Sequence, residues 1–202
     1  MRRLLPAHLA IIFAPLMFLS GCANLNKTVT INSIDAFPVC YGYGCKKTQR
    51  ISLSTDQWSR IDALFSPPAA NAIQERQKIA LAIAEMERLV GPMTNTQNDL
   101  PGTFKAFFIS KRQQMDCVDE AKNSTTYLKM FRQRGLIRLH RTVHRINRGF
   151  FLNGWPHTSA AIQEIKNKQG FAVDSWFHKN GLPPEIIPIK LWYSGWSPPE
   201  IE

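Results

Sequence analysis

One stretch near the middle of the chain decides the fold, and it reads Gln113-Gln114-Met115-Asp116-Cys117-Val118-Asp119-Glu120-Ala121. It places Cys117 at the start of a predicted helix, with polar residues before the cysteine and the acids Asp119 and Glu120 after it. The helix continues to about residue 134, where Gly135 ends it. Small and apolar side chains recur on one face of this helix, namely Cys117, Ala121, Ser124, Leu128 and Phe131. This spacing predicts a helix that is buried in the middle of a domain.

Two helices are predicted before the cysteine helix. The first begins at a capping box formed by Ser54 and Gln57, and it ends at Ser66-Pro67-Pro68. The second covers about residues 70–90 and ends at Gly91-Pro92. The apolar stripes of both helices are typical of core packing.

The second half of the chain changes from a helical to a nearly alternating pattern. Residues 136–146 are predicted as a strand, and residues 158–165 and 171–176 as two more strands joined by a turn at 166–170. A last short helix is predicted at residues 189–196. This order predicts an α+β fold, in which N-terminal helices precede a central cysteine-bearing helix packed on a small antiparallel β-sheet.

The first 21 residues have the features of an export signal. Arginines at positions 2 and 3 precede an apolar run over residues 4–18, which is too short to span a membrane comfortably. Leu19-Ser20-Gly21-Cys22 follows this run and resembles the lipobox of bacterial lipoproteins. A plain signal peptide without lipidation is the alternative interpretation.

The lipobox resemblance implies that Cys22 becomes the lipidated first residue of the mature chain. Because Ala23 rather than an aspartate follows it, the resemblance also implies an outer-membrane lipoprotein of the bacterial cell envelope that faces the periplasm. Its contact with the membrane is the lipid anchor, since more than one acyl chain gives stable anchoring. The predicted division is a signal peptide at residues 1–21, a tether at 22–36 and a single α+β domain at 37–202.

The chain is basic, with a formal net charge of +10 at pH 7. The excess is concentrated in residues 129–148, called the basic strip, which contains Lys129, Arg132, Arg134, Arg138, Arg141, Arg145 and Arg148. An exported protein meets little nucleic acid, so no nucleic acid partner is expected. Anionic lipid head groups or another anionic envelope surface fit this charge. A solvated face without a partner is the alternative.

Cysteine usage separates one thiol from the others. Cys40 and Cys45 lie within a predicted loop at residues 37–47, with glycines between them that allow a tight turn. An oxidising compartment favours their pairing as a disulfide. With Cys22 lipidated, Cys117 is the cysteine that this pairing does not use. Such a cysteine in an exported protein is either deeply buried or a reactive thiol.

A reactive thiol needs an imidazole nearby, because the thiolate is the nucleophile. His157 follows the aromatic stretch 150–156 and opens a predicted strand, where the sheet meets solvent. His140 and His144 lie in the basic strip, whose charge predicts a surface position, and His178 lies near a loop. His157 is therefore the best-placed histidine.

Asp174 is predicted to lie beside His157 on the neighbouring strand. If the hairpin turns near Asn167, Asp174 comes opposite Ser159 and one diagonal step from His157, within reach of its side chain. Asp174 is also the only acid in residues 171–176, where an unpaired charge among bulky apolar side chains is costly. The alternative is an edge-strand aspartate that faces water.

Three features together resemble the transglutaminase-like cysteine peptidases of bacteria, in the papain-like group. They are Asp116-Cys117 at a helix start, His157 at a strand start and Asp174 on the adjoining strand. The resemblance covers about residues 105–196. It implies Cys117 as the nucleophile, His157 as general base and then acid, and Asp174 as the residue that orients the imidazole.

The same resemblance implies an oxyanion hole and an aromatic cleft. The backbone N–H of Cys117 would be one oxyanion donor, and Gln114 or Gln113 the other. Trp155 and Trp176 would form the walls of the cleft, with core packing as the alternative role for at least one of them. Asp119 and Glu120 favour the helix dipole, but their charge would oppose a nearby thiolate.

The sequence thus predicts a lipid-anchored cell-envelope cysteine hydrolase or acyltransferase. It would act on amide bonds of a protein or a peptidoglycan peptide, without a metal or another cofactor. The alternative is a non-catalytic envelope lipoprotein with a binding or scaffolding role, whose contact surface would be the basic strip and the aromatic loop 150–155. A third interpretation is a metal site built from His140, His144, His157 and Asp174, although the acids that metals usually recruit do not flank the first two.

Overall fold

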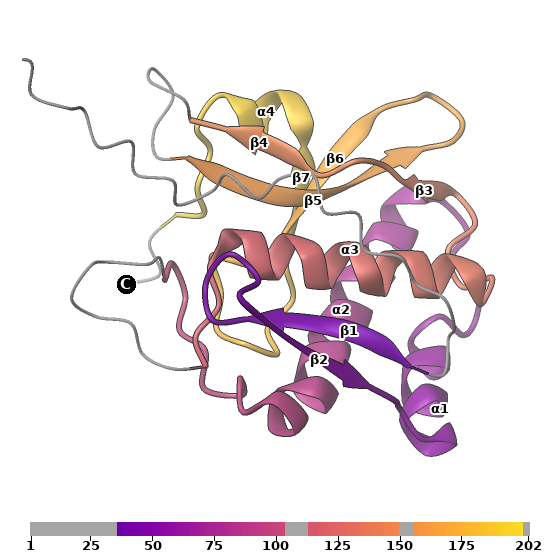
Figure 1. Ribbon diagram of the computed structural model, residues 1–202. Coiled ribbons are helices and arrows are strands. Elements are labelled where there is room, and N and C mark those ends of the chain that lie inside the picture. Colours follow the sequence, from indigo (N-terminus) through magenta and orange to yellow (C-terminus); the bar gives the residue numbers. More distant parts are fainter. Residues whose placement is uncertain (1–35, 104–112, 150–155, 200–202) are drawn as a thin grey trace, which may run out of the picture.

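The computed structural model describes residues 36–103, 113–149 and 156–199 (Figure 1). The elements follow the chain in the order β1 Phe37–Tyr41, β2 Lys47–Ile51, α1 Thr55–Leu64, α2 Ala72–Thr94, α3 Cys117–Gln133, β3 His140–Thr142, β4 Ile146–Arg148, β5 His157–Glu164, β6 Gly170–Asp174, β7 Glu185–Pro188 and α4 Ile189–Tyr193. The predicted signal peptide, Cys22 with nearly all of the predicted tether, and Trp155 lie outside the described residues. In the described part of the chain, no helix is long and apolar enough to cross a membrane.

Helix α3 forms the middle layer of the domain (Figure 1). On one side it packs against an antiparallel sheet with the strand order β3-β5-β6-β7, in which β4 also pairs with β5. On the other side lie the β1–β2 hairpin, α1 and α2. The combination of helices and antiparallel sheets confirms the α+β class that the sequence predicts.

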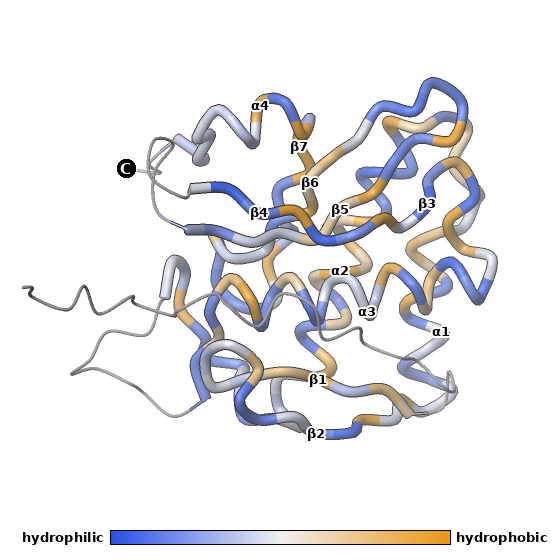
Figure 2. Tube along the Cα trace, turned by 45° about the horizontal axis from the view of Figure 1, so that its top comes forward, coloured by the Kyte–Doolittle hydropathy of each residue, from blue (hydrophilic) through white to orange (hydrophobic). Residues whose placement is uncertain are grey.

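The core lies on both sides of α3. Tyr127 packs edge-on against Phe37 of β1, and Phe131 packs against Phe65 at the C-cap of α1, with ring centroids 6.0 and 5.7 Å apart. Ile162 of β5 contributes a fully buried side chain from the sheet. Each such side chain stabilises the fold by about 1.5–3 kcal/mol. The predicted burial of the cysteine helix is confirmed, while the outer strand β2 is hydrophilic (Figure 2).

Local signals at the helix ends are confirmed. Ser54 Oγ accepts a hydrogen bond from Gln57 N at 3.2 Å, and Ser54 N donates to Gln57 Oε1 at 2.8 Å, which completes the predicted capping box of α1. Gly135 follows the C-cap of α3 with a φ of +72°, a conformation that glycine adopts readily. These short-range signals need no tertiary contact to act.

Residues 136–146, predicted as one strand, form parts of two short strands instead. β3 ends with Thr142 opposite Ile162, whereas β4 begins with Ile146 opposite Ser159. The β3–β4 segment therefore has one residue more than the facing part of β5, as in a β-bulge. The bulge interrupts the ladder, and for this reason the prediction of a single strand is wrong.

Helix α2 continues past Gly91-Pro92, where the sequence predicts its end. Proline is most costly in a helix interior, because it lacks the N–H that the helix would use. Here it lies in the last turn, and Asn95 ends the helix with a φ of +58°. Thr96 N donates to Gly91 O at 2.9 Å and closes this end.

Three strands and the end of the last helix differ from the sequence-based expectation. The predicted loop at residues 37–47 belongs to a β1–β2 hairpin, and β7 precedes α4. β2 carries mostly exposed polar residues and β7 is only four residues long, so neither has a clear apolar alternation. Helix α4 ends at Tyr193 rather than at residue 196.

Candidate functional site

Cys117 is the first residue of α3, and Asp116 caps that helix. Asp116 Oδ1 accepts hydrogen bonds from the backbone N–H groups of Val118 and Asp119, each at 3.0 Å. Asp119 in turn accepts from Asp116 N at 3.2 Å and completes a capping box. Cys117 is 5% exposed and carries a thiol outside the disulfide. The positive end of the helix dipole lies at this residue and favours the thiolate.

His157 and Asp174 form a buried hydrogen-bonded pair at the ends of two neighbouring strands. His157 Nε2 lies 2.6 Å from Asp174 Oδ2. Because Ala160 pairs with Val173, continuing the register by one residue places Asp174 opposite Ser159, as the sequence predicts. Both side chains of the pair are buried, so Asp174 is not a water-facing edge aspartate.

The second ring nitrogen of His157 is not satisfied in the same way. Nδ1 is buried and has no hydrogen-bond partner among the residues that the structure describes. If Nε2–H donates to the Asp174 carboxylate, the neutral ring carries its basic lone pair on Nδ1. Leaving a buried polar atom unpaired is costly, so such an atom calls for an explanation. One explanation is that Nδ1 serves as the proton acceptor for a reacting group.

Aromatic rings surround the imidazole. The ring centroids of Trp176, Phe177 and Trp192 lie 4.7, 5.4 and 5.5 Å from that of His157. Trp176 thus lines the His157 site, where the resemblance places a wall, whereas Trp155 lies outside the described residues. The rings restrict the orientation of the imidazole and keep water from its bond to Asp174.

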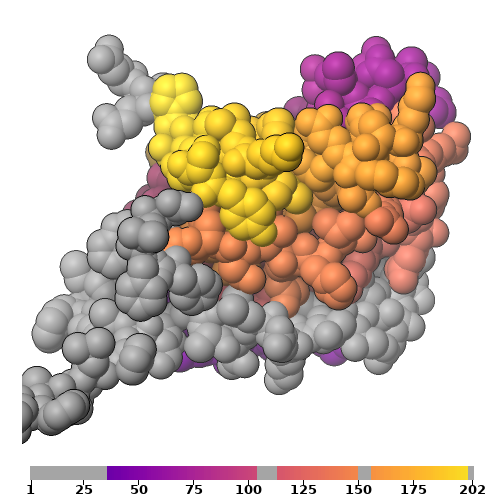
Figure 3. Space-filling model, turned by 90° about the horizontal axis from the view of Figure 1, so that it is seen from above, coloured from indigo at the N-terminus to yellow at the C-terminus, as the bar shows by residue number. Residues whose placement is uncertain are grey.

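Trp192 bonds Asp174 from the C-terminal segment, and Arg148 of β4 bonds that segment, contacts that the sequence does not predict. Trp192 Nε1 donates to Asp174 Oδ2 at 2.7 Å, so this oxygen binds both the indole and His157. The Arg148 guanidinium lies 4.5 Å from the centre of the Trp192 ring, and it donates to the carbonyl oxygens of Trp192 and Trp196. Figure 3 shows the C-terminal segment (yellow) next to the strand residues coloured orange on this face of the molecule.

The start of α3 and the His157–Asp174 pair lie at the same end of the domain, but the strand register places the pair on the sheet face opposite to Ile162 and Val173, which pack in the core with α3. In the described part of the chain, no hydrogen bond joins His157 Nδ1 to Cys117. β5 and α3 begin on the same side of the molecule (Figure 1). Thr103 connects the two regions, since its hydroxyl donates to Met115 O and its carbonyl oxygen accepts from Trp176 Nε1 at 2.7 Å. Met115 lies two residues before Cys117, and Trp176 packs on His157.

Gln114 braces the loop that precedes α3. Its side-chain oxygen accepts from Leu100 N at 3.0 Å, and its Nε2 donates to Asn98 O at 3.0 Å. The neighbouring Gln113 has a φ of +79°. These bonds give Gln114 a structural role, and its part in an oxyanion hole stays a prediction.

The acids after Cys117 are buried rather than solvated. Burial, together with the charge of Asp116, raises the pKa of Asp119 to about 8. Burial and the neighbouring Glu87 and Asp99 raise the pKa of Glu120 well above its usual value. The expected opposition to a thiolate is therefore reduced, because these groups bind protons more strongly than ordinary carboxylates do.

Glu87 and Glu120 also line a small, partly open pocket. Its volume is about 10 Å³, and Tyr127 and Asn180 form part of its wall. Glu87 Oε1 and Glu120 Oε2 are both buried and make no hydrogen bond to any described residue. Burial is also the main reason that the pKa of Glu87 rises to about 8. This carboxyl cluster lies on the hairpin side of α3 and is a cost to the folded state at high pH.

The other histidines have different surroundings. The surface position predicted for His140 is wrong, because its ring is fully buried and bonds to Glu75 of α2 at 2.9 Å. His144 is exposed, as predicted. His178 lies 2.9 Å from Glu185 of β7. Within residues 36–103, 113–149 and 156–199, no group of three potential ligands could hold a metal ion, which contradicts the metal-site interpretation for these histidines and Asp174.

The basic strip is not a single solvated face. Arg132 donates to His140 O at 2.7 Å, Arg134 pairs with Asp62 at 2.7 Å, and Arg148 stacks on Trp192. Burial lowers the pKa of Arg145 and Arg148. Much of the strip's positive charge is therefore used inside the domain rather than offered to an external surface.

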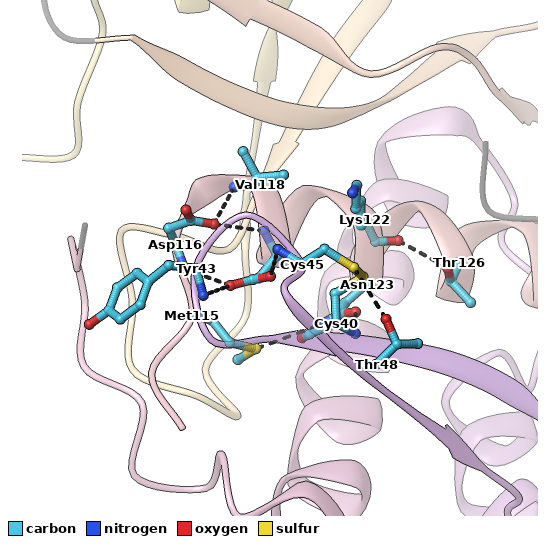
Figure 4. Close-up of a disulfide and its surroundings, with 11 residues drawn as sticks. Cys40, Tyr43, Cys45, Thr48, Met115, Asp116, Val118, Lys122, Asn123 and Thr126 are labelled. Carbon is cyan, nitrogen blue, oxygen red and sulfur yellow. Dashed lines mark hydrogen bonds between the residues drawn. A yellow bond between two sulfur atoms is a disulfide. The ribbon is translucent and has the colours of Figure 1, made fainter. Parts of the chain in front are cut away.

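The predicted disulfide between Cys40 and Cys45 is present (Figure 4). The sequence missed Thr103, Arg148 and Trp192, because nothing in their local pattern indicates the distant groups that they contact. Comparison of the chain with known protein families, with curated proteins and with solved structures finds no match.

Proposed function

We propose that this protein is a cysteine hydrolase or acyltransferase that acts on amide bonds, with a fold of the transglutaminase and papain-like type. The observation that carries the proposal is the His157 imidazole, which binds Asp174 through Nε2 and leaves a buried Nδ1 without a partner among the described residues. The position of Cys117 at the N-terminus of α3, at the same end of the domain, supports its role as the nucleophile.

The reaction that fits these groups proceeds in two halves. His157 Nδ1 takes the proton of the Cys117 thiol, the sulfur attacks the amide carbonyl carbon, and the carbonyl electrons move to oxygen. The backbone N–H of Cys117 is one donor for that oxyanion. When the C–N bond breaks, the imidazolium gives its proton to the leaving amine, and an acyl-thioenzyme remains.

Water or a second amine completes the cycle. Its proton passes to His157 as it attacks the thioester carbon, and the same proton returns to the sulfur when the C–S bond breaks. Asp174 keeps the ring in the required tautomer and stabilises the imidazolium. The lipobox resemblance supports a place at the outer membrane, facing the periplasm, where a protein or a peptidoglycan peptide would be the substrate.

Alkylation of Cys117 in the folded, full-length protein tests the proposal. An ordinary thiol with a pKa near 8.5 is almost fully protonated at pH 6, whereas a thiolate paired with an imidazolium persists there. We expect Cys117 to react with iodoacetamide at pH 6 about 30-fold faster than an ordinary thiol. Cys117→Ala should remove the labelled peptide from the mass spectrum. A folded wild-type protein that resists the probe contradicts the proposal.

A non-catalytic envelope lipoprotein is the second candidate function. The burial of Cys117 and His157, at 5% and 4% exposed, favours it, because a nucleophile must meet its substrate. The internal use of the basic strip argues against that strip as the contact surface. The same alkylation experiment separates the two candidates, since a scaffold has no reason to keep a reactive thiol.

A further inference from the structure

The loop closed by the Cys40–Cys45 disulfide contacts the first turn of α3 (Figure 4). Tyr43 N donates to Asp119 Oδ2 at 2.8 Å, and Cys45 N donates to Asp119 Oδ1 at 2.6 Å. Both side-chain oxygens of Asp119 therefore accept a hydrogen bond from this loop. Asp119 lies two residues after Cys117 and is fully buried.

Two further contacts lie on either side of Asp119. Gly42 N donates to Gln114 O at 3.0 Å, three residues before Cys117. In the second turn of α3, Asn123 accepts from Cys40 N at 2.7 Å and donates to Cys40 O at 2.9 Å. The disulfide loop thus forms hydrogen bonds to the chain before, within and after the turn that carries Cys117. On the loop side, all of these bonds are made by backbone atoms.

These hydrogen bonds depend on an unusual backbone conformation of the loop. Four consecutive loop residues have positive φ values, namely Gly42 at 82°, Tyr43 at 67°, Gly44 at 71° and Cys45 at 59°. Non-glycine residues adopt this region at an energetic cost, so the surrounding structure must maintain it. In this conformation the N–H groups of Tyr43 and Cys45 both point to Asp119, which accepts them. The disulfide joins the two ends of this segment and restricts its alternatives.

We propose that the Cys40–Cys45 loop, acting through Asp119, is a positioning element that fixes the first turn of α3 and hence the Cys117 sulfur relative to His157. The inference rests on the proposed thiol function. It has a redox consequence: a dithiol that reduces Cys40–Cys45 to two thiols, and is itself oxidised to a disulfide, lowers the reactivity of Cys117. Most thiol enzymes respond to reductants in the opposite sense, because reduction restores their nucleophile.

The test measures iodoacetamide alkylation of Cys117 against pH in the full chain, with the modified peptide identified by mass spectrometry. Asp119→Asn removes one acceptor oxygen and keeps the disulfide, while the double variant Cys40→Ser with Cys45→Ser removes the disulfide and keeps the loop length. We expect the rate at pH 6 to fall about tenfold in both, toward the profile of an ordinary thiol.

A matched control is Arg134→Gln, which breaks the Arg134–Asp62 ion pair at the other end of α3. It should lower the thermal midpoint without changing the pH profile of Cys117. If the double variant does not fold, dithiol treatment of the folded wild type gives the same comparison. Unchanged reactivity at pH 6 in folded Asp119→Asn, or in the reduced wild type, overturns the positioning role while leaving the thiol function intact. A wild type without reactivity at pH 6 overturns both.

Discussion

Two buried histidines in this domain each bind a carboxylate, and only one of them has all its polar atoms satisfied. His140 Nδ1 bonds Glu75 at 2.9 Å, and its Nε2 lies 3.2 Å from Arg76 Nη1. Both ring nitrogens of His140 therefore have a polar partner. His157 uses one nitrogen for Asp174 and leaves the other without a described partner.

The carboxylates differ in the same way. Glu75 also accepts the backbone N–H groups of Arg138, Leu139 and His140 at 2.8–3.0 Å. Burial alone would raise its pKa, but the bonds from His140 and from that backbone outweigh burial, and the pKa of Glu75 is lowered. This pair fixes β3 to α2 and has no capacity left for chemistry. The comparison shows that a histidine–carboxylate pair is a candidate catalytic element only where one nitrogen remains to act.

The largest expected effect comes from replacing each ring with an amide. His157→Gln should lower the alkylation rate of Cys117 at pH 6 about 30-fold, to that of an ordinary thiol. His140→Gln should leave alkylation unchanged but lower the free energy of unfolding by about 2–3 kcal/mol, because the Glu75 charge loses a buried donor. Urea denaturation measures the free energy of unfolding of both variants, and iodoacetamide alkylation measures the reactivity of Cys117 in each. Equal effects of the two substitutions on alkylation would break the comparison.

A smaller effect is expected from Glu87, a buried carboxyl without an imidazole partner. Burial raises its pKa to about 8 in the folded protein, against about 4.3 when unfolded. The contribution of Glu87 to the free energy of unfolding is therefore fully present below pH 4, and it is lost as the pH rises through about 8. Glu87→Gln should raise the free energy of unfolding by about 2 kcal/mol at pH 8 and change it little at pH 4. Denaturation curves at both pH values measure this, and a gain confined to low pH would refute it.

The smallest effect is expected from Trp192→Phe, which tests the hydrogen bond from the indole to Asp174. Trp192→Phe keeps the ring that packs on His157 but removes the N–H bonded to Asp174 Oδ2. One hydrogen bond to a carboxylate is worth about 1.5–3 kcal/mol, and only part of it should reach the thiol. We expect about a threefold lower alkylation rate at pH 6. Leu191→Ala, at the exposed neighbouring position, is the control and should have no effect.

Local chemistry explains which features could be predicted from the sequence. The start and end of α3 and the register that puts Asp174 near His157 depend on residues close together in the chain. The Cys40–Cys45 pairing has the same local origin. The bonds of Trp192 to Asp174 and of Asp119 to the disulfide loop join segments 18 to 76 residues apart, and no periodicity encodes them.

The error at His140 has the same physical cause. Its basic neighbours predict exposure, but Glu75, 65 residues earlier in the chain, supplies the charge that lets the ring be buried. A buried charge is tolerated when it is paired, and the sequence does not reveal the pairing. Burial of polar residues is thus the part of this fold that depends most on tertiary contacts.

The extra residue between β3 and β4 decides which side of the sheet Arg148 serves. Paired residues point to the same face, and a shift of one residue reverses the faces. Across β3, Thr142 shares a face with Ile162, which belongs to the core; across β4, Arg148 shares a face with His157. If the register of β3 continued unbroken to residue 148, Arg148 would lie opposite residue 156 and would share the face of Ile162. A single-residue deletion within 143–145 would join β3 and β4 into one continuous register on β5 and would leave Arg148 opposite His157.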